Sequence, residues 1–162
     1  MSQHQPEPVR FYQPGAYRAD ESVGYLIKRV LSSMVSEIDQ QLAAHDLTYV
    51  QWLPLYKLAK GEGDTLAALA RELDIDPGAL TRSIDRLEAK GLLQRERSTT
   101  DRRVVHLLLT DAGRAVAREV APVLASVLNA HLQGFTHAEW QQLVDMLRRM
   151  LANGEALRQA RS

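Results

Sequence analysis

The feature that most constrains the fold is a pair of short apolar periodicities between Thr65 and Leu87. The apolar residues recur every three or four positions, which is the spacing of an amphipathic helix. The four residues Asp74-Ile75-Asp76-Pro77 interrupt the pattern, and Asp76 followed by proline is typical of a helix N-cap and first turn. The stretch therefore predicts a helix-turn-helix, in which the small Ala70 lies where the helices cross. Asp74 stands where simple units of this kind often have glycine.

After Gly91, apolar residues recur at every second position instead of every third or fourth, which is the spacing of a strand. Residues 92–97 and 104–109 are predicted strands, and Ser98-Thr99-Thr100-Asp101 is the turn between them. His106 alternates with apolar neighbours and is expected to face outward, as scaffold or beside a phosphate. The sequence thus predicts a hairpin, or wing, directly after the second helix of the pair.

Long amphipathic helices are expected on either side of this unit. One runs from Ser22 to about Ala44, and a second follows the cap Thr48 and stops at Gly61, with Pro54 suggesting a kink or a later start. A helix capped by Thr110 and bent at Pro122, and another opened by a capping box at 136–139, complete the chain. The predicted fold class is mainly α with a small β-hairpin wing: a winged helix-turn-helix plus an α-helical dimerisation region.

Composition restricts the function classes. The 162 residues contain 20 Lys+Arg, 20 Asp+Glu and no cysteine, so bulk charge does not favour nucleic acid and a thiol switch is excluded. We find no secretion signal and no apolar run long enough to cross a membrane, and we expect a cytoplasmic protein without membrane contact. No glycine-rich phosphate loop, nucleophile elbow or metalloprotease motif is present, so we expect no enzyme activity, no cofactor and no metal.

Three segments resemble the MarR (multiple antibiotic resistance regulator) family. They are the wing sequence from Asp101 to Gly113, the preceding stretch from Thr81 to Leu93, and the helix opening from Leu47 to Trp52. The resemblance covers roughly residues 22–155 and implies a homodimeric DNA-binding transcriptional regulator. It implies an arm over 1–20, a winged DNA-binding domain over 47–110, and a dimerisation region over 21–46 and 111–162.

The predicted DNA contacts come from the second helix and the wing. A recognition helix that begins at Asp76 would point its first turn into a major groove, and small residues there allow close approach to the bases. Arg82 suits guanine or phosphate, although a solvated helix face is the alternative; Arg86 suits phosphate or an internal ion pair. Arg103 resembles the family's minor-groove arginine, oriented by Asp101, while Arg95, Arg97 and Arg102 could contact phosphates. The predicted contact residues are Pro77, Gly78, Ala79, Thr81, Arg82, Arg86, Arg97, Asp101, Arg102 and Arg103.

The terminal helices carry more apolar surface than the winged unit can cover. A two-fold dimer would place paired recognition helices on a palindromic operator, whereas the alternative is that these helices close a monomer core. Residues 1–20 are either a disordered arm or a strap whose aromatic residues pack on a partner subunit.

A small aromatic anionic effector is expected from the family, bound between the winged and dimerisation regions. Aromatic side chains with a few cations suit an aromatic carboxylate or phenol. The alternative for each residue is an ordinary core or interface role. The candidates are Tyr17, Arg18, Tyr25, His45, Tyr49, Trp52 and Tyr56. The leading functional hypothesis is a ligand-released repressor, and the alternative is a winged-helix protein-interaction module that binds neither DNA nor ligand.

Overall fold

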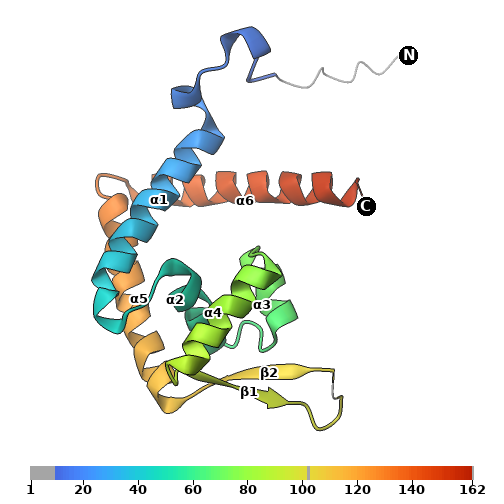
Figure 1. The fold of residues 1–162 in the computed structure, drawn as a ribbon. Coiled ribbons are helices and arrows are strands. Elements are labelled where there is room, and N and C mark those ends of the chain that lie inside the picture. The colour runs from blue at the N-terminus through green and yellow to red at the C-terminus, as the bar shows by residue number, and fades with distance from the viewer. Residues whose placement is uncertain (1–9, 102, 162) are drawn as a thin grey trace.

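A winged helical fold emerges from the computed structural model, which describes residues 10–101 and 103–161 (Figure 1). The helices are α1 (Val23–Gln41), α2 (Tyr49–Ala59), α3 (Leu66–Leu73), α4 (Pro77–Ala89), α5 (Asp111–His131) and α6 (His137–Gln159). Strands β1 (Leu93–Arg97) and β2 (Val105–Leu109) form an antiparallel hairpin, and short 3-10 helices occupy Pro14–Ala16, Ala19–Glu21 and Ala43–His45. This order confirms the predicted fold class.

Local capping hydrogen bonds set the starts of the helices. In each case a side-chain oxygen accepts from the backbone N–H three residues later, which satisfies a donor that the first turn leaves unpaired. The donor–acceptor distances are 3.2 Å for Thr65, 2.9 Å for Asp76, 3.0 Å for Thr110 and 3.2 Å for Thr136. The predicted caps of α4, α5 and α6 are therefore confirmed, and Thr65 caps α3 in the same way.

The end of α1 differs from the prediction, whereas the predicted start of α2 after Thr48 is confirmed. α1 ends at Gln41, and the chain to His45 forms a 3-10 turn, so the helix is shorter than the apolar pattern suggested. α2 begins at Tyr49, where Gln51 Oε1 accepts from the Thr48 N–H at 3.2 Å. A later start at Pro54 is wrong, because Pro54 lies buried inside the helix.

The wing is anchored to the loop that precedes α3. Leu93 pairs with Leu109 and Arg97 with Val105 at the ends of the hairpin. Beyond the hairpin, the Leu107 N–H donates to the Asp64 carbonyl at 2.7 Å, and His106 Nδ1 lies 2.8 Å from Asp64 Oδ2. His106 is therefore a partner of this loop rather than a free outward-facing side chain.

The hydrophobic core lies where α2, α4, α5, the end of α1 and the hairpin meet. Burial of this apolar surface fixes α4 on the rest of the winged unit, which leaves the opposite face of α4 for other contacts. Fully buried core side chains are Leu42, Leu55, Leu69, Leu80, Ile84, Leu87, Leu93, Val120 and Val127.

α6 and the first half of α1 contribute little to this core. Figure 1 shows α6 leaving the end of α5 as a separate rod and α1 leading to the N-terminal segment. No residue described in α6 is buried. Large apolar side chains are exposed on both helices: Val23, Leu26, Ile27, Val30 and Leu31 on α1, and Trp140, Leu143, Met146, Met150 and Leu151 on α6.

Candidate nucleic-acid interface

The predicted helix-turn-helix is formed by α3 and α4. Asp74 ends α3 in the left-handed conformation, at φ 50° and ψ 39°, the region that glycine adopts most readily. Its N–H donates to the Ala70 carbonyl, which closes the last turn of α3. Asp76 then caps α4 within two residues. The turn is short because an aspartate accepts the conformation that glycine takes in simpler units.

α4 is held against α2 by a buried polar contact as well as by apolar packing. Ser83 is 3% exposed, and its hydroxyl donates to the Val50 carbonyl in the first turn of α2. This contact satisfies a buried donor and fixes the rotation of α4 about its own axis. This role of Ser83 could not be predicted from the sequence, because a serine between apolar positions carries no signal that distinguishes it from a solvated one.

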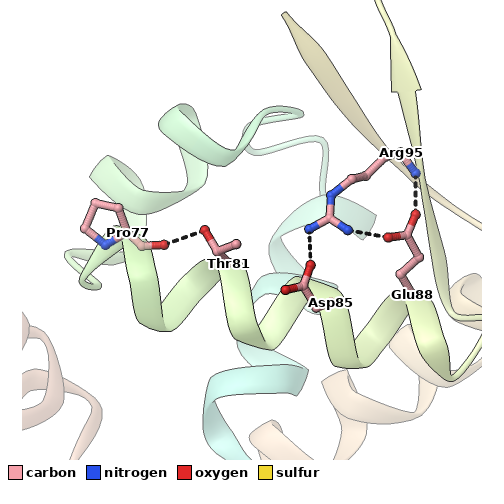
Figure 2. Close-up of polar contacts among 5 residues, drawn as sticks. All are labelled: Pro77, Thr81, Asp85, Glu88 and Arg95. Atoms are coloured by element: carbon pink, nitrogen blue, oxygen red, sulfur yellow. Dashed lines mark hydrogen bonds and ion pairs between the residues drawn. The ribbon is translucent and has the colours of Figure 1, made fainter.

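The first turns of α4 present an exposed face. Pro77, Gly78, Thr81 and Arg82 are exposed, whereas Ala79 is half-buried. The Thr81 hydroxyl donates to the Pro77 carbonyl at 2.8 Å (Figure 2). A Cβ added at Gly78 would lie 3.2 Å from Asp76 Oδ1, so the bare glycine keeps this turn open around the cap. The structure places these predicted contact residues together on one surface.

Arg95 on β1 binds two acids of α4. Its Nη2 lies 2.6 Å from Asp85 Oδ1, its Nη1 pairs with Glu88 Oε2, and its backbone N–H donates to Glu88 Oε1 at 3.2 Å (Figure 2). Burial opposes the charged form, but hydrogen bonds to Asp85 and Glu88 outweigh it and raise the pKa of Arg95. The prediction of a phosphate contact for Arg95 is therefore corrected: its guanidinium joins the wing to α4.

Hydrogen bonds between side chains and the backbone of nearby residues shape the tip of the wing. Ser98 Oγ accepts from the Asp101 N–H at 3.2 Å, and Asp101 Oδ1 accepts from the Arg103 N–H at 3.0 Å. Asp101 thus holds the backbone of Arg103. The side chains of Arg97, Asp101 and Arg103 are exposed, while Arg102 lies outside the described residues.

Some charged side chains of this face form ion pairs, and others do not. Arg95 occupies Asp85 and Glu88, and Lys90 Nζ lies 2.9 Å from Asp46 Oδ2. Across residues 10–101 and 103–161, no ion pair engages the guanidinium groups of Arg82, Arg86, Arg97 and Arg103. This region therefore presents four guanidinium groups to solvent, while two of its acids, Asp85 and Glu88, are paired with Arg95.

The residues predicted to bind a ligand have other partners. Arg18 Nη2 pairs with Asp20 Oδ2 at 2.8 Å, and the hydrogen bond raises the pKa of Arg18. His45 Nε2 lies 2.8 Å from Glu119 Oε2 on α5, and Trp52 Nε1 donates to Asp39 Oδ1 at 2.9 Å.

The aromatic members of the set come from one loop position and two helices. Tyr17 lies between two 3-10 turns and Tyr25 in the first turn of α1, where its hydroxyl accepts from Arg29 at 3.2 Å. Tyr49 packs edge-on against Trp52 with ring centroids 5.2 Å apart, and Lys60 lies over the ring of Tyr56. α2 therefore contributes three of these rings, and the other two come from separate parts of the chain.

Two surface hollows lie elsewhere. One lies between α1 and α5 and includes Ser33, Glu37 and His131; the other lies at the root of the wing and includes Leu107, Arg114 and Arg118. Neither is lined by a residue of the predicted ligand set, whereas a further hollow in the N-terminal segment includes Arg18.

Two kinds of site have no counterpart in the described part of the chain. No three His, Cys, Asp or Glu side chains there are grouped so as to hold a metal ion. No helix there combines the length and apolarity that crossing a membrane requires.

Comparisons with known proteins agree on one family. Residues 47–105 match the model of the MarR family. The HTH-type transcriptional regulator TtmR of Methylorubrum extorquens (strain PA1) is 37% identical over 109 residues, which is 67% of this chain and 55% of that protein. The match thus spans about half the length of this curated relative.

Solved structures are similar to this chain over more than four fifths of its length. BpsR of Bordetella bronchiseptica, whose DNA binding is regulated by 6-hydroxynicotinic acid, is 29% identical with a TM-score of 0.73, over 83% of this chain and 96% of that chain. A MarR family transcriptional regulator from Silicibacter pomeroyi is 26% identical with a TM-score of 0.75, over 88% and 96% of the two chains.

The fold and the helix-turn-helix with its wing define a winged-helix transcriptional regulator. This chain belongs to the MarR family.

Proposed function

We propose that this protein is a homodimeric, sequence-specific DNA-binding repressor. α4 enters the major groove with Pro77, Gly78, Ala79, Thr81 and Arg82, and the wing places Arg103 in the adjacent minor groove. The observation that carries this proposal is the difference in ion pairing between the acids and the arginines of one face. There Arg95 binds the acids of α4, whereas no ion pair with another described residue engages Arg82, Arg86, Arg97 or Arg103. Phosphate affinity depends on such local cations rather than on net charge.

Single substitutions test the DNA contacts. Arg103→Ala and Arg82→Ala are expected to weaken binding to duplex DNA, and Arg82→Ala also to relax the sequence preference, as loss of a bidentate base contact does. Arg86→Ala and Arg97→Ala should weaken binding to all duplexes and reduce the salt slope by about one each. Arg148→Ala on α6 is the matched control. Unchanged affinity of Arg103→Ala for every duplex would favour the protein-interaction module instead.

We assign the exposed apolar faces of α1 and α6 to the partner subunit. These faces belong to the proposed dimerisation region, residues 21–46 and 111–162, beside the DNA-binding domain over 47–110. Leu151 is 67% exposed, so Leu151→Asp should fold normally but shift the solution mass from two chains to one. A wild-type protein that sediments as a single chain at micromolar concentration contradicts the proposal.

We propose that a small aromatic carboxylate or phenol releases the repressor from its palindromic operator. The regulation of BpsR by 6-hydroxynicotinic acid supports this class of effector. The effector would bind between the two regions of the dimer, near Tyr49, Trp52 and Tyr56, with Tyr17, Arg18, Tyr25 and His45 as the remaining candidates. Binding need only favour the released conformation by a few kcal/mol to change occupancy strongly.

Thermal shift and DNA release together test the effector. 6-Hydroxynicotinic acid and a panel of aromatic acids and phenols are added to the dimer, with cyclohexanecarboxylic acid as the non-aromatic control. A rise in the melting temperature accompanied by release of bound DNA is expected for at least one aromatic compound. No shift with any of them contradicts the effector class but leaves the DNA-binding proposal intact.

A further inference from the structure

We propose that Thr81 selects an A·T base pair in the major groove, and that it does so through its methyl group and not by donating a hydrogen bond. The inference rests on the proposed DNA-binding function, which it deepens by naming the base pair that one residue of α4 recognises.

The hydroxyl group of Thr81 is already committed as a donor. Its Oγ1 lies 2.8 Å from the carbonyl oxygen of Pro77, one helical turn earlier (Figure 2). That carbonyl belongs to a proline at the first position of α4. A hydroxyl has one hydrogen, so while this bond exists the oxygen can only accept. Thr81 therefore presents an acceptor and a methyl group to whatever contacts α4.

These two groups match one base pair best. Guanine presents only acceptors, N7 and O6, on the major-groove edge, and a side chain with no free donor cannot satisfy them. Cytosine offers the N4 donor but lacks a methyl group. An A·T pair offers both the adenine N6 donor and the thymine C5 methyl on the same edge. Thr81 is therefore complementary to A·T and mismatched with guanine.

The neighbours of Thr81 favour this assignment. The next exposed residue in the same row is Asp85, which could accept from cytosine, but its carboxylate is held by Arg95 at 2.6 Å (Figure 2). Arg82, on the adjacent row, carries the donors that guanine requires. Two consecutive residues of α4 therefore have different roles. Arg82 supplies donors, and Thr81 supplies the apolar contact.

The experiment uses the 162-residue chain and begins by finding the DNA sequence that it binds. Duplexes are selected from a random-sequence library by the wild-type dimer. Affinities are then measured for the selected duplex and for copies in which deoxyuridine replaces one thymine at a time, which removes only the C5 methyl. The proteins compared are wild type, Thr81→Val, which keeps the methyl shape without the hydroxyl, and Thr81→Ser, which keeps the hydroxyl without the methyl.

We expect one thymine per half-site at which deoxyuridine lowers wild-type affinity by about threefold, the effect of one lost methyl contact. Thr81→Val should keep this penalty, because it keeps the methyl contact, whereas Thr81→Ser should lose it. Ser126→Ala on α5 is the control and should behave as wild type.

Three outcomes overturn the inference. Loss of the deoxyuridine penalty in Thr81→Val would show that the contact with this thymine depends on the hydroxyl and not on the methyl group. A deoxyuridine penalty that persists unchanged in Thr81→Ser, or one absent from wild type at every thymine, would show that the Thr81 methyl is not the contact. Failure of the wild type to enrich any sequence would instead overturn the proposed function, so the two failures are distinguishable.

Discussion

The α-carbon of Gly113 faces the carbonyl of Leu92 so closely that a Cβ added there would lie 1.8 Å from the carbonyl oxygen. The close approach occurs where α5 leaves the hairpin. Thr110 reinforces it, because its N–H donates to the same carbonyl at 3.1 Å. The glycine that follows the Leu-Thr cap thus permits the start of α5 to pack directly on the chain that enters β1.

Replacing this glycine tests the packing. Gly113→Ala should lower the free energy of unfolding by about 2–4 kcal/mol, because backbone rather than a flexible side chain must move. Chemical denaturation measures the change. Gly24→Ala, where the nearest contact of the new Cβ is a side-chain oxygen at 4.0 Å, is the matched control and should be neutral or stabilising. Equal effects of the two substitutions would contradict the packing argument.

Removing Arg95 should weaken DNA binding without removing a DNA contact. In Arg95→Leu the carboxylates of Asp85 and Glu88 become unpaired beside the phosphates, and affinity should fall roughly tenfold. Fluorescence anisotropy at several salt concentrations measures the loss.

The origin of that loss can be separated by rescue. Adding Asp85→Asn and Glu88→Gln to Arg95→Leu removes the uncompensated charges, so most of the affinity should return. If Arg95 itself contacted phosphate, the triple variant would bind as weakly as the single one.

Ser83 supplies a stability prediction. Ser83→Ala leaves the Val50 carbonyl without its buried donor, and unfolding should become easier by about 1–2 kcal/mol. Replacing Ser126, an exposed serine on α5, by alanine should change stability by less than about 0.5 kcal/mol. A loss at position 83 no larger than at position 126 would mean that the hydroxyl contributes nothing.

The capping box of α6 has a defined pH dependence. Hydrogen bonds from the Thr136 N–H, at 2.7 Å, and from its hydroxyl, at 2.8 Å, lower the pKa of Glu139 below its ordinary value of 4.5. Because the folded-state pKa is the lower one, the stabilisation is fully present above pH 4.5 and is lost as the pH falls through the folded-state pKa.

An NMR titration of the Glu139 carboxyl tests this dependence directly. Its midpoint should lie below that of an unstructured glutamate. In Thr136→Ala, which removes the hydroxyl donor, the midpoint should move upward. A midpoint at or above 4.5 in the wild type would contradict the capping geometry.

The helices and their starts could be predicted from local sequence. Asp76, Thr110 and Thr136 each accept from a backbone N–H three residues away, so the information lies within one turn and is readable from residue type and spacing. The period change at Gly91 likewise located the hairpin. The same local pattern placed Thr81 and Arg82 on the exposed face of α4.

The partners of residues that are distant in the chain emerged from the packed fold alone. The sequence suggested a phosphate contact for Arg95, but the packing of β1 against α4 pairs it with two acids of α4, and Ser83 gains its role from Val50 on another helix. The close approach of Gly113 to Leu92 arises in the same way. Such contacts depend on how elements pack, and a pattern of residue types along one element does not encode the atoms that a neighbouring element will bring.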